Sequence, residues 1–212
     1  MGMLEDFELL KRHRFRLLPY GWARTKTEAH LIAKSLGYPV ALKIISDEIS
    51  HKTDVGGVKI GLKNDQSLSL AYDEIMENAR LATGNGKPIR GVLVQKMARK
   101  GIELIIGGKK DSQFGHMIIL GLGGVYVEIF RDISARLCPI SEKDVEDMID
   151  ELKSHPLIEG ARGQKGINVA GLKELMLSTC RMMEKEDVKE LDLNPVIFDS
   201  NGYDIVDARI MK

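Results

Sequence analysis

The stretch RGVLVQKMARKGIELIIGGKKDSQFGHMIILGLG, residues 90–123, decides the fold class. It contains three β-rich runs in close succession, at 90–98, 102–111 and 115–123. A fourth β-rich piece follows at 125–140. The second half of the chain is therefore predicted to begin as a series of strands.

Helices and strands are mixed upstream of this stretch. Apolar residues recur at helical spacing over 25–38 and 65–83, which predicts two amphipathic helices. Between them, the apolar run at 39–45 and the alternating run at 58–62 predict two strands joined by a loop.

The chain closes with further helices and strands. Helices are predicted over 141–155, where Ser141 and Asp144 come close to a capping box, and over 168–186. Closing strands are predicted over 188–199 and 203–211. This order, with no internal repeat, is typical of an α+β fold.

Composition excludes several classes of protein. The 212 residues carry 31 Lys+Arg and 31 Asp+Glu, so the formal net charge of zero argues against nucleic-acid and membrane-surface binding. The basic run at 11–16 is interpreted as a solvated face, and the most apolar segment, 117–130, is too short to span a bilayer. Cys138 and Cys180 are interpreted as buried thiols of a protein in a reducing compartment, and a cytoplasmic location is expected.

Lys43 lies inside the apolar strand VALKI. A lysine is almost never fully buried unless it is paired. Either it lies on an edge strand and extends to solvent, or its charge is directed at phosphate oxygens.

The segment QKMARKGIELIIG, 95–107, reads as two strands joined by a basic turn. A solvated hairpin tip would account for its lysines and arginine without any ligand. Glu103, between apolar neighbours, is harder to explain in this way, and a ribose hydroxyl would be a natural partner for it.

A candidate metal site lies near the C-terminus, in ELDLNPV (190–196) and DIVDARI (204–210). Strand alternation places Asp192 and Asn194 on one face, and a hairpin would bring Asp207 close to them. Carboxylate and amide oxygens suit Mg²⁺ with substrate phosphates completing its shell. The alternative is a solvated face on an edge hairpin, which Pro195 favours.

The loop SHKTDVGGVKIGL, 50–62, combines His51 with charged residues and a glycine pair. Gly56 and Gly57 could turn backbone N–H groups toward an anion, while Lys52 and Lys59 add positive charge. By default such a histidine is a surface or hydrogen-bonded residue. Together with Lys43 and the carboxylate set, however, the loop fits a nucleotide phosphoryl-transfer site, because phosphates brought together must be neutralised.

Four segments in order carry a family resemblance: LGYPVALKI, SHKTDVGGVKIGL, IELIIGGKKDSQFGHMIILGLGGVYVEIFRD and ELDLNPV…VDARI. From about residue 25 to the C-terminus, the chain resembles the ATP-grasp β subunit of ADP-forming acetyl-CoA synthetases, the NDP-forming acyl-CoA synthetase family. The resemblance implies an ATP-grasp fold of two α+β lobes, with ATP or ADP held between them. We place the lobes at 1–90 and 91–212.

The resemblance also implies roles for individual residues. Lys43 would contact the nucleotide phosphates, Glu103 would bind ribose, and His51 would be a phosphohistidine relay that passes a phosphoryl group to ADP. Three consecutive residues would read adenine, largely through the backbone, and three others would bind Mg²⁺. The adenine-reading residues are Gln95, Lys96 and Met97, and the metal ligands are Asp192, Asn194 and Asp207. Lys52, Lys59, Gly56 and Gly57 would stabilise the phosphorylated ring, with GLGG (121–124) and Arg136 as further phosphate contacts.

The implied reaction is acyl-CoA + ADP + phosphate giving acid + ATP + CoA. The chain has no evident GxGxxG segment for CoA, so an α subunit with the CoA site and the first phosphohistidine is implied, in an α2β2 heterotetramer. The rivals are the matching succinyl-CoA synthetase subunit, which is not expected to carry the His51 motif, and an ATP-grasp carboxylate–amine ligase. A regulatory nucleotide-binding module of an acyltransferase is the non-enzyme alternative.

Overall fold

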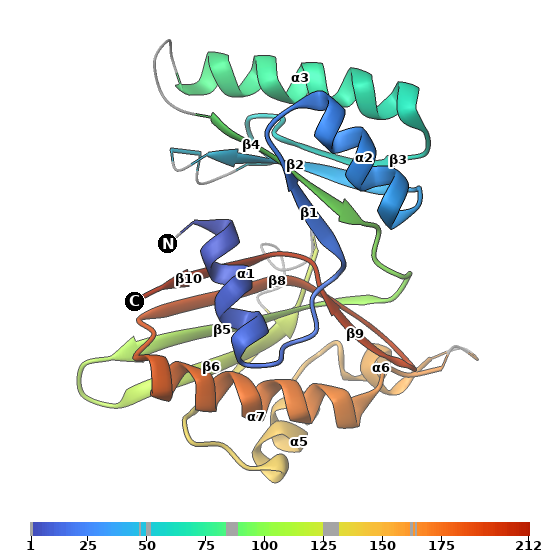
Figure 1. Ribbon diagram of the computed structural model, residues 1–212. Coiled ribbons are helices and arrows are strands. Elements are labelled where there is room, and N and C mark those ends of the chain that lie inside the picture. Colours follow the sequence, from blue (N-terminus) through green and yellow to red (C-terminus); the bar gives the residue numbers. More distant parts are fainter. Residues whose placement is uncertain are drawn as a thin grey trace. The chain divides into compact units, whose positions relative to one another are not determined.

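The computed structural model describes residues 2–46, 48–49, 52–83, 89–124, 132–161, 163 and 165–212. The chain divides into two compact units, one formed by residues 18–97 and the other by 3–17 together with 98–212. The division expected after residue 90 therefore falls after residue 97, and the first helix belongs with the C-terminal unit. Each unit is an α+β structure with its own sheet (Figure 1).

The unit of residues 18–97 is a four-stranded sheet in the order β1-β4-β2-β3 with two helices. All its strand pairs are antiparallel. The elements are β1 (Tyr20–Ala23), α2 (Lys26–Leu36), β2 (Val40–Ser46), β3 (Val58–Leu62), α3 (Asp65–Thr83) and β4 (Ile89–Lys96). The predicted helices and strands of this region are thus confirmed to within a few residues, while β1 was not predicted.

Helices α2 and α3 cover one face of this sheet (Figure 1). Strand alternation sends Leu42 and Val94 into a core with Ala33 and Ile75 from the helices. The intervening residues of β2 and β4 lie on the opposite face, which carries no helix of this unit. That face holds Lys43 and Gln95, discussed below.

The second unit is a six-stranded sheet, ordered β10-β8-β5-β6-β7, with β9 also paired to β8. Its strands are β5 (Ile102–Asp111), β6 (Gly115–Leu122), β7 (Ile133–Leu137), β8 (Glu190–Asp199), β9 (Gly202–Ile205) and β10 (Ala208–Met211). Its helices are α1 (Met3–Arg12), α5 (Glu142–Asp150), α6 (His155–Glu159) and α7 (Val169–Glu186).

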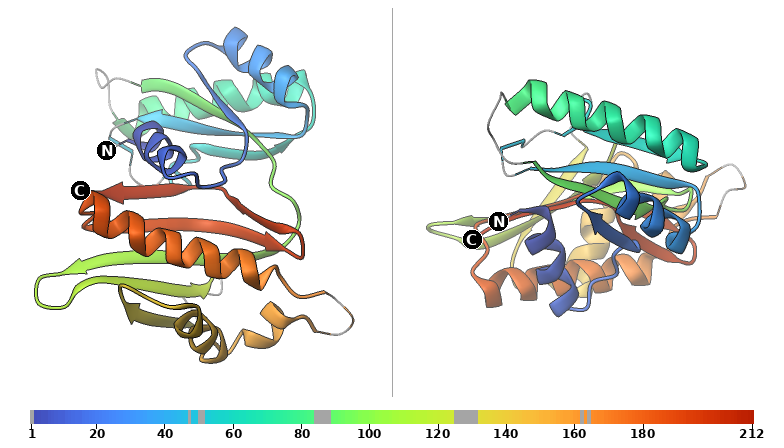
Figure 2. Two further views of the ribbon diagram at one scale, coloured as in Figure 1. Left: turned by 60° about the horizontal axis from the view of Figure 1, so that its bottom comes forward. Right: turned by 45° about the horizontal axis from the view of Figure 1, so that its top comes forward.

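Helix α7 runs along one face of this sheet (Figure 2). Leu104, Leu193 and Phe198 are fully buried on this face, and a methyl group added at Gly108 would lie 2.3 Å from Met183 Sδ of α7. Residues Glu103, Asp192 and Asn194 alternate with these buried side chains and so lie on the opposite face.

Three expectations about local structure differ from what is observed. The helix predicted over 141–155 ends at Asp150 as α5, which begins with the expected Ser141–Asp144 capping box, and α6 starts separately at His155. The predicted closing strand 203–211 is interrupted between β9 and β10. The strand predicted over 125–140 is observed only as β7, and residues 125–131 lie outside the described residues.

Cys138 and Cys180 form a disulfide with a Cα–Cα distance of 5.8 Å. The bond joins the residue that follows β7 to helix α7. The expectation of two buried free thiols was wrong, because a 42-residue separation in the sequence carries no information about distance in the fold. None of the helices in the described ranges is long and apolar enough to cross a membrane.

Candidate nucleotide-binding site

Lys43 lies in β2, which pairs with β4 on one side and β3 on the other. Its side chain is only 4% exposed, so the interpretation of an edge lysine that extends to solvent is wrong. Lysine is seldom buried to this extent without a functional or structural partner. The contact of Lys43 with nucleotide phosphates stays a prediction.

Gln95 shares the helix-free face of the sheet with Lys43, because it pairs with Ala41, two residues before Lys43. It is 1% exposed, and its Nε2 atom has no hydrogen-bond partner among the described residues. A buried polar atom without a partner costs free energy and is typical of a site that is completed by a ligand. This observation supports a binding role for the Gln95 side chain, whereas the sequence suggested a role mainly for its backbone.

The other two expected adenine-reading residues use their backbone N–H groups within the same unit. Lys96 N donates to Pro19 O at 2.9 Å, and Met97 N donates to Pro39 O at 3.4 Å. These two donors are thus occupied in the strands that the structure describes.

Gly56 and Gly57 shape the turn before β3. Gly56 N donates to Thr53 O at 3.0 Å, and Gly57 N donates to Lys52 O at 2.7 Å. A methyl group at Gly57 would lie 2.6 Å from Ile44 Cγ2, so this position requires glycine. Both amides therefore close the turn, and the expected anion-binding nest is wrong for this conformation.

Two other cations expected near phosphate are paired elsewhere. Lys59 Nζ lies 2.7 Å from Glu74 Oε2 of α3. Arg136 forms two ion-pair contacts with Glu151, at 2.6 and 3.0 Å, which hold the pKa of Glu151 down to about 2. Each of these cations has a structural partner, which the sequence did not indicate. His51, the expected phosphoryl carrier, lies outside the described residues.

Glu103 lies on the helix-free face of the second sheet, next to the GLGG segment. Gly123 N donates to Glu103 O at 2.6 Å, and a methyl group at Gly124 would lie 3.2 Å from Glu103 Oε2. Gly124 also has a φ of +74°, in the left-handed region that favours glycine. The structure thus brings these residues together, as an exposed carboxylate beside a glycine turn.

The three expected metal ligands also converge on this helix-free face. Asp192 and Asn194 alternate with buried Leu191 and Leu193 on β8, and Asn194 N donates to Asp207 O at 3.2 Å. Strand β8 is paired on both sides, so the interpretation as an edge hairpin was wrong.

The charges of this cluster influence one another. Desolvation raises the pKa of Asp192, a hydrogen bond from Asn194 lowers it, and the negative charge of Asp207 raises it again. Arg209, which pairs with Asp192 across β8 and β10, lowers it. The sequence analysis missed Arg209, which lies in β10, two residues after Asp207.

The donor set fits a hard cation. It provides two carboxylates and one amide oxygen, and the proximity of two negative charges favours a divalent ion between them. Within the described ranges, no group of three His, Cys, Asp or Glu side chains is placed to hold a metal, so phosphate or water oxygens would have to complete the shell.

A profile of the ATP-grasp domain matches residues 2–211. The chain is 39% identical to the β subunit of acetate–CoA ligase [ADP-forming] I of Pyrococcus furiosus, over 98% of this chain and 89% of that protein. The chain belongs to the ATP-grasp family, among the β subunits of ADP-forming acetate–CoA ligases. The match includes the N-terminal residues, where the resemblance read from the sequence was weaker.

Other ATP-grasp relatives agree with this assignment. Acetate–CoA ligase [ADP-forming] I of Archaeoglobus fulgidus is 41% identical over 98% of this chain, but the chain spans only 30% of that protein. The solved acetyl-coenzyme A synthetase 1 of Ca. Korarchaeum cryptofilum, in complex with coenzyme A and Ca-AMPCP, superposes with a TM-score of 0.93 at 40% identity, covering 100% of this chain and 92% of that one. A second complex of that protein contains Mg-AMPPCP and has its phosphohistidine segment pointing towards the nucleotide binding site, with a TM-score of 0.83 at 38% identity and coverage of 99% and 91%.

Proposed function

We propose that this chain is the nucleotide-binding β subunit of an ADP-forming acyl-CoA synthetase. The net reaction is acyl-CoA + ADP + phosphate giving acid + ATP + CoA, and this subunit catalyses the step that passes a phosphoryl group to ADP. The observation that supports this most strongly is the convergence of Asp192, Asn194 and Asp207 beside each other on the helix-free face of a sheet in an ATP-grasp chain.

Both units contribute side chains to nucleotide binding in this proposal. From residues 18–97, Lys43 supplies positive charge for the phosphates, and Gln95 offers its unpartnered amide to the base. From the second unit, Glu103 binds the ribose hydroxyls. Asp192, Asn194 and Asp207 hold Mg²⁺, which neutralises phosphate charge so that an anionic donor and ADP can approach.

His51 is the proposed phosphoryl carrier. A neutral imidazole nitrogen attacks the phosphorus of a phosphohistidine on the partner subunit, and the N–P bond to that histidine breaks. The phosphorylated ring of His51 then donates the phosphoryl group to the β-phosphate oxygen of ADP, which forms ATP and regenerates neutral His51.

The proposed partner is an α subunit that carries the CoA site and the first phosphohistidine, in an α2β2 assembly in the cytoplasm. The solved relative with coenzyme A and a phosphohistidine segment supports the existence of such parts in the complete enzyme. The long single-chain relative in Archaeoglobus fulgidus fits the same reaction with both parts in one polypeptide.

A single-turnover experiment tests this function. The α subunit is phosphorylated with labelled phosphate and acetyl-CoA, purified, and mixed with this chain and Mg·ADP. We expect the label to appear in ATP only when this chain is present. Transfer to ADP by the phosphorylated α subunit alone, or no transfer with the pair, would contradict the proposal.

A further inference from the structure

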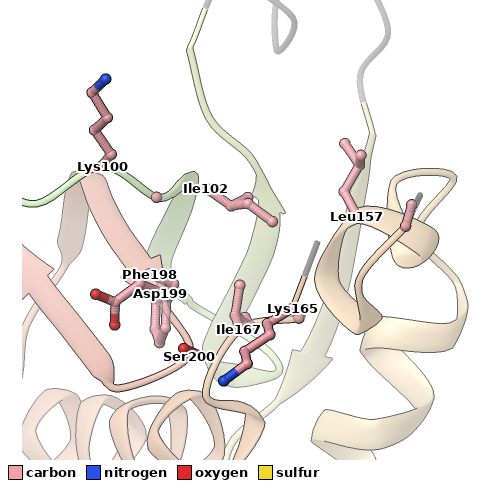
Figure 3. Close-up of a pocket in the computed structure, with 11 residues that line it drawn as sticks. Lys100, Ile102, Leu157, Lys165, Ile167, Phe198, Asp199 and Ser200 are labelled. Atoms are coloured by element: carbon pink, nitrogen blue, oxygen red, sulfur yellow. The ribbon is translucent and has the colours of Figure 1, made fainter. Parts of the chain in front are cut away.

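A cavity of about 730 Å³ lies at one end of the second unit's sheet. It is bordered by the start of β5, the end of β8, helix α6 and the loop that precedes α7 (Figure 3). Pockets of about 300–1,000 Å³ are typical of small-molecule sites. Its size is therefore suited to a small organic ligand.

Backbone contacts build the walls of this cavity. Ile167 N donates to Ile158 O of α6 at 2.9 Å, and Asn168 N donates to Asp199 O of β8 at 2.8 Å. A methyl group at Gly166 would lie 2.3 Å from Glu159 O, and one at Gly101 would lie 2.1 Å from Phe198 O. Close backbone contacts thus hold together the described segments that border the cavity.

The lining combines apolar side chains with the polar residues Lys100, Lys165, Asp199 and Ser200. Ile102 and Ile167 extend into the cavity from facing segments, and Leu157 of α6, 48% exposed, lies at its opposite side (Figure 3). The Lys165 side chain runs toward Ser200, whereas the amine of Lys100 points away from both (Figure 3).

The charge near Lys165 and Ser200 is positive and not compensated locally. Asp199, the acidic residue of the lining, is paired with Arg99 at 2.9 Å and accepts the amides of Asn201 and Gly202. No carboxylate among the described residues pairs with Lys165. The Lys165 amine and the Ser200 hydroxyl could therefore bind an anionic group of a ligand at the edge of the apolar surface.

The cavity lies on the other side of the second unit's sheet from Glu103 and the proposed metal ligands. Ile102 pairs with Phe198, and their side chains face the helix-covered side, where Phe198 is fully buried. The next pair, Glu103 and Ile197, faces the helix-free side. The cavity is therefore separate from the proposed ribose and metal ligands.

We propose that this cavity binds a small organic monocarboxylate with an aryl or branched-alkyl body. The apolar body packs against Ile102, Ile167 and Leu157, and the carboxylate lies between the Lys165 amine and the Ser200 hydroxyl. This site is independent of the proposed function, since none of its residues takes part in phosphoryl transfer.

The test is calorimetric titration of the full-length chain with benzoate, supported by ligand-observed NMR. We expect saturable binding of one benzoate per chain, with little binding of acetate, inorganic phosphate or benzyl alcohol. Lys165→Gln should weaken benzoate binding by about three- to fivefold, the loss expected for contact with a solvent-exposed charge. Lys100→Gln removes the same charge from the same lining and should change the affinity by less than about twofold.

The apolar wall has its own matched pair of variants. Leu157→Ser should weaken benzoate binding, while Leu137→Ser, at a leucine of similar exposure (49%) outside the cavity lining, should not. Both leucines are half exposed, so both variants are expected to fold, which thermal unfolding checks.

Several results would overturn the proposal. These are the absence of saturable benzoate binding, equal losses in Lys165→Gln and Lys100→Gln, phosphate binding as tight as that of benzoate, or displacement of benzoate by Mg·ADP. Absence of saturable binding would mean that there is no site. Equal losses in the two lysine variants, or tight phosphate binding, would indicate diffuse charge attraction. Displacement by Mg·ADP would place benzoate in the nucleotide site.

Discussion

Asp192 shows how several neighbouring groups act on one carboxylate of the proposed metal site. Its pKa is raised first by desolvation, and the negative charge of Asp207 adds to this, although Asn194 and Arg209 oppose it. Carboxylates brought together in this way are stabilised by a divalent cation. If Asp192 and Asp207 hold Mg²⁺ as proposed, Mg·nucleotide binding would relieve the cost of bringing these carboxylates together.

The corresponding prediction concerns Mg-nucleotide affinity. Asp192→Ala should weaken Mg·ADP binding by at least about tenfold. Mutation of a residue that only hydrogen-bonds to a metal ligand already lowers metal affinity by about 10–100-fold, and loss of a ligand itself should cost no less. Isothermal titration with and without Mg²⁺ measures this. Glu190→Gln, on the same exposed face of β8 but outside the ligand set, is the matched control and should bind Mg·ADP normally. Unchanged affinity in Asp192→Ala would remove it from the metal site.

His51 carries the second prediction at this scale. His51→Ala should leave Mg·ADP binding within about twofold of wild type, but should reduce phosphoryl transfer to ADP by at least about a thousandfold, as expected for loss of a nucleophile. Rapid-quench measurement of labelled ATP tests it. Normal turnover by this variant would exclude His51 as the carrier.

Short motifs fix residue types and spacing, so the sequence could name Lys43, Glu103 and the Asp192–Asn194–Asp207 set as candidate site residues. Their roles in binding stay predictions. Burial and pairing could not be read in this way. Whether Lys43 lies in a central strand, or Arg136 pairs with Glu151, depends on contacts between segments far apart in the sequence.

At the scale of elements, two kinds of interaction hold β7 to the helices beside it. The Cys138–Cys180 disulfide attaches the end of β7 to α7, and the Arg136–Glu151 pair attaches β7 to the end of α5. Strand β7 is at the edge of the sheet and has only β6 as a strand neighbour among the described residues. The disulfide and the ion pair therefore help to hold β7 in place, since its backbone pairs with a strand on one side.

The disulfide predicts a measurable contribution to stability. A cross-link that closes a 42-residue segment is expected to stabilise the native state by about 4 kcal/mol, through restriction of the unfolded chain. Reduction, or the double change Cys138→Ser and Cys180→Ser, should lower the free energy of urea unfolding by up to that amount. Thiol titration of the denatured, unreduced protein should find no free cysteine. Two titratable thiols in protein prepared without reductant would contradict the bond.

The ion pair predicts a pH dependence. Because the pKa of Glu151 falls from 4.5 to about 2 on folding, its stabilising effect is complete above about pH 4.5 and is lost as the pH falls toward 2. The difference in unfolding free energy between wild type and Glu151→Gln should therefore be largest above pH 5 and shrink below it. Glu184→Gln, at an exposed position on α7, is the control for loss of one surface carboxylate. A difference independent of pH would contradict the pairing.

The secondary-structure pattern was largely accessible from the sequence, for a physical reason. Alternating and helical apolar periods persist over whole elements, so most helices and strands were placed within a few residues. The exceptions depend on tertiary contacts. Strand β1 is short and is defined by pairing with β4, and the interruption between β9 and β10 coincides with the Val206 N to Pro195 O hydrogen bond.

At the scale of the whole molecule, the chain spans 89% of a β subunit in Pyrococcus furiosus and 30% of a ligase in Archaeoglobus fulgidus. The first relation indicates that a chain of this extent can work as a separate subunit. The second indicates that the same domain also works as part of a longer polypeptide. Both are consistent with a nucleotide-binding part that depends on another part for CoA chemistry.

The most direct test is ATP formation by this chain co-expressed and co-purified with its α subunit. Supplied with acetyl-CoA, Mg·ADP and phosphate, the wild-type complex should form one ATP for each CoA released. The complex containing Asp192→Ala should release far less of both at the same nucleotide concentration. CoA release without ATP formation, or wild-type ATP formation by the Asp192→Ala complex, would contradict the assignment of this chain as the subunit that phosphorylates ADP.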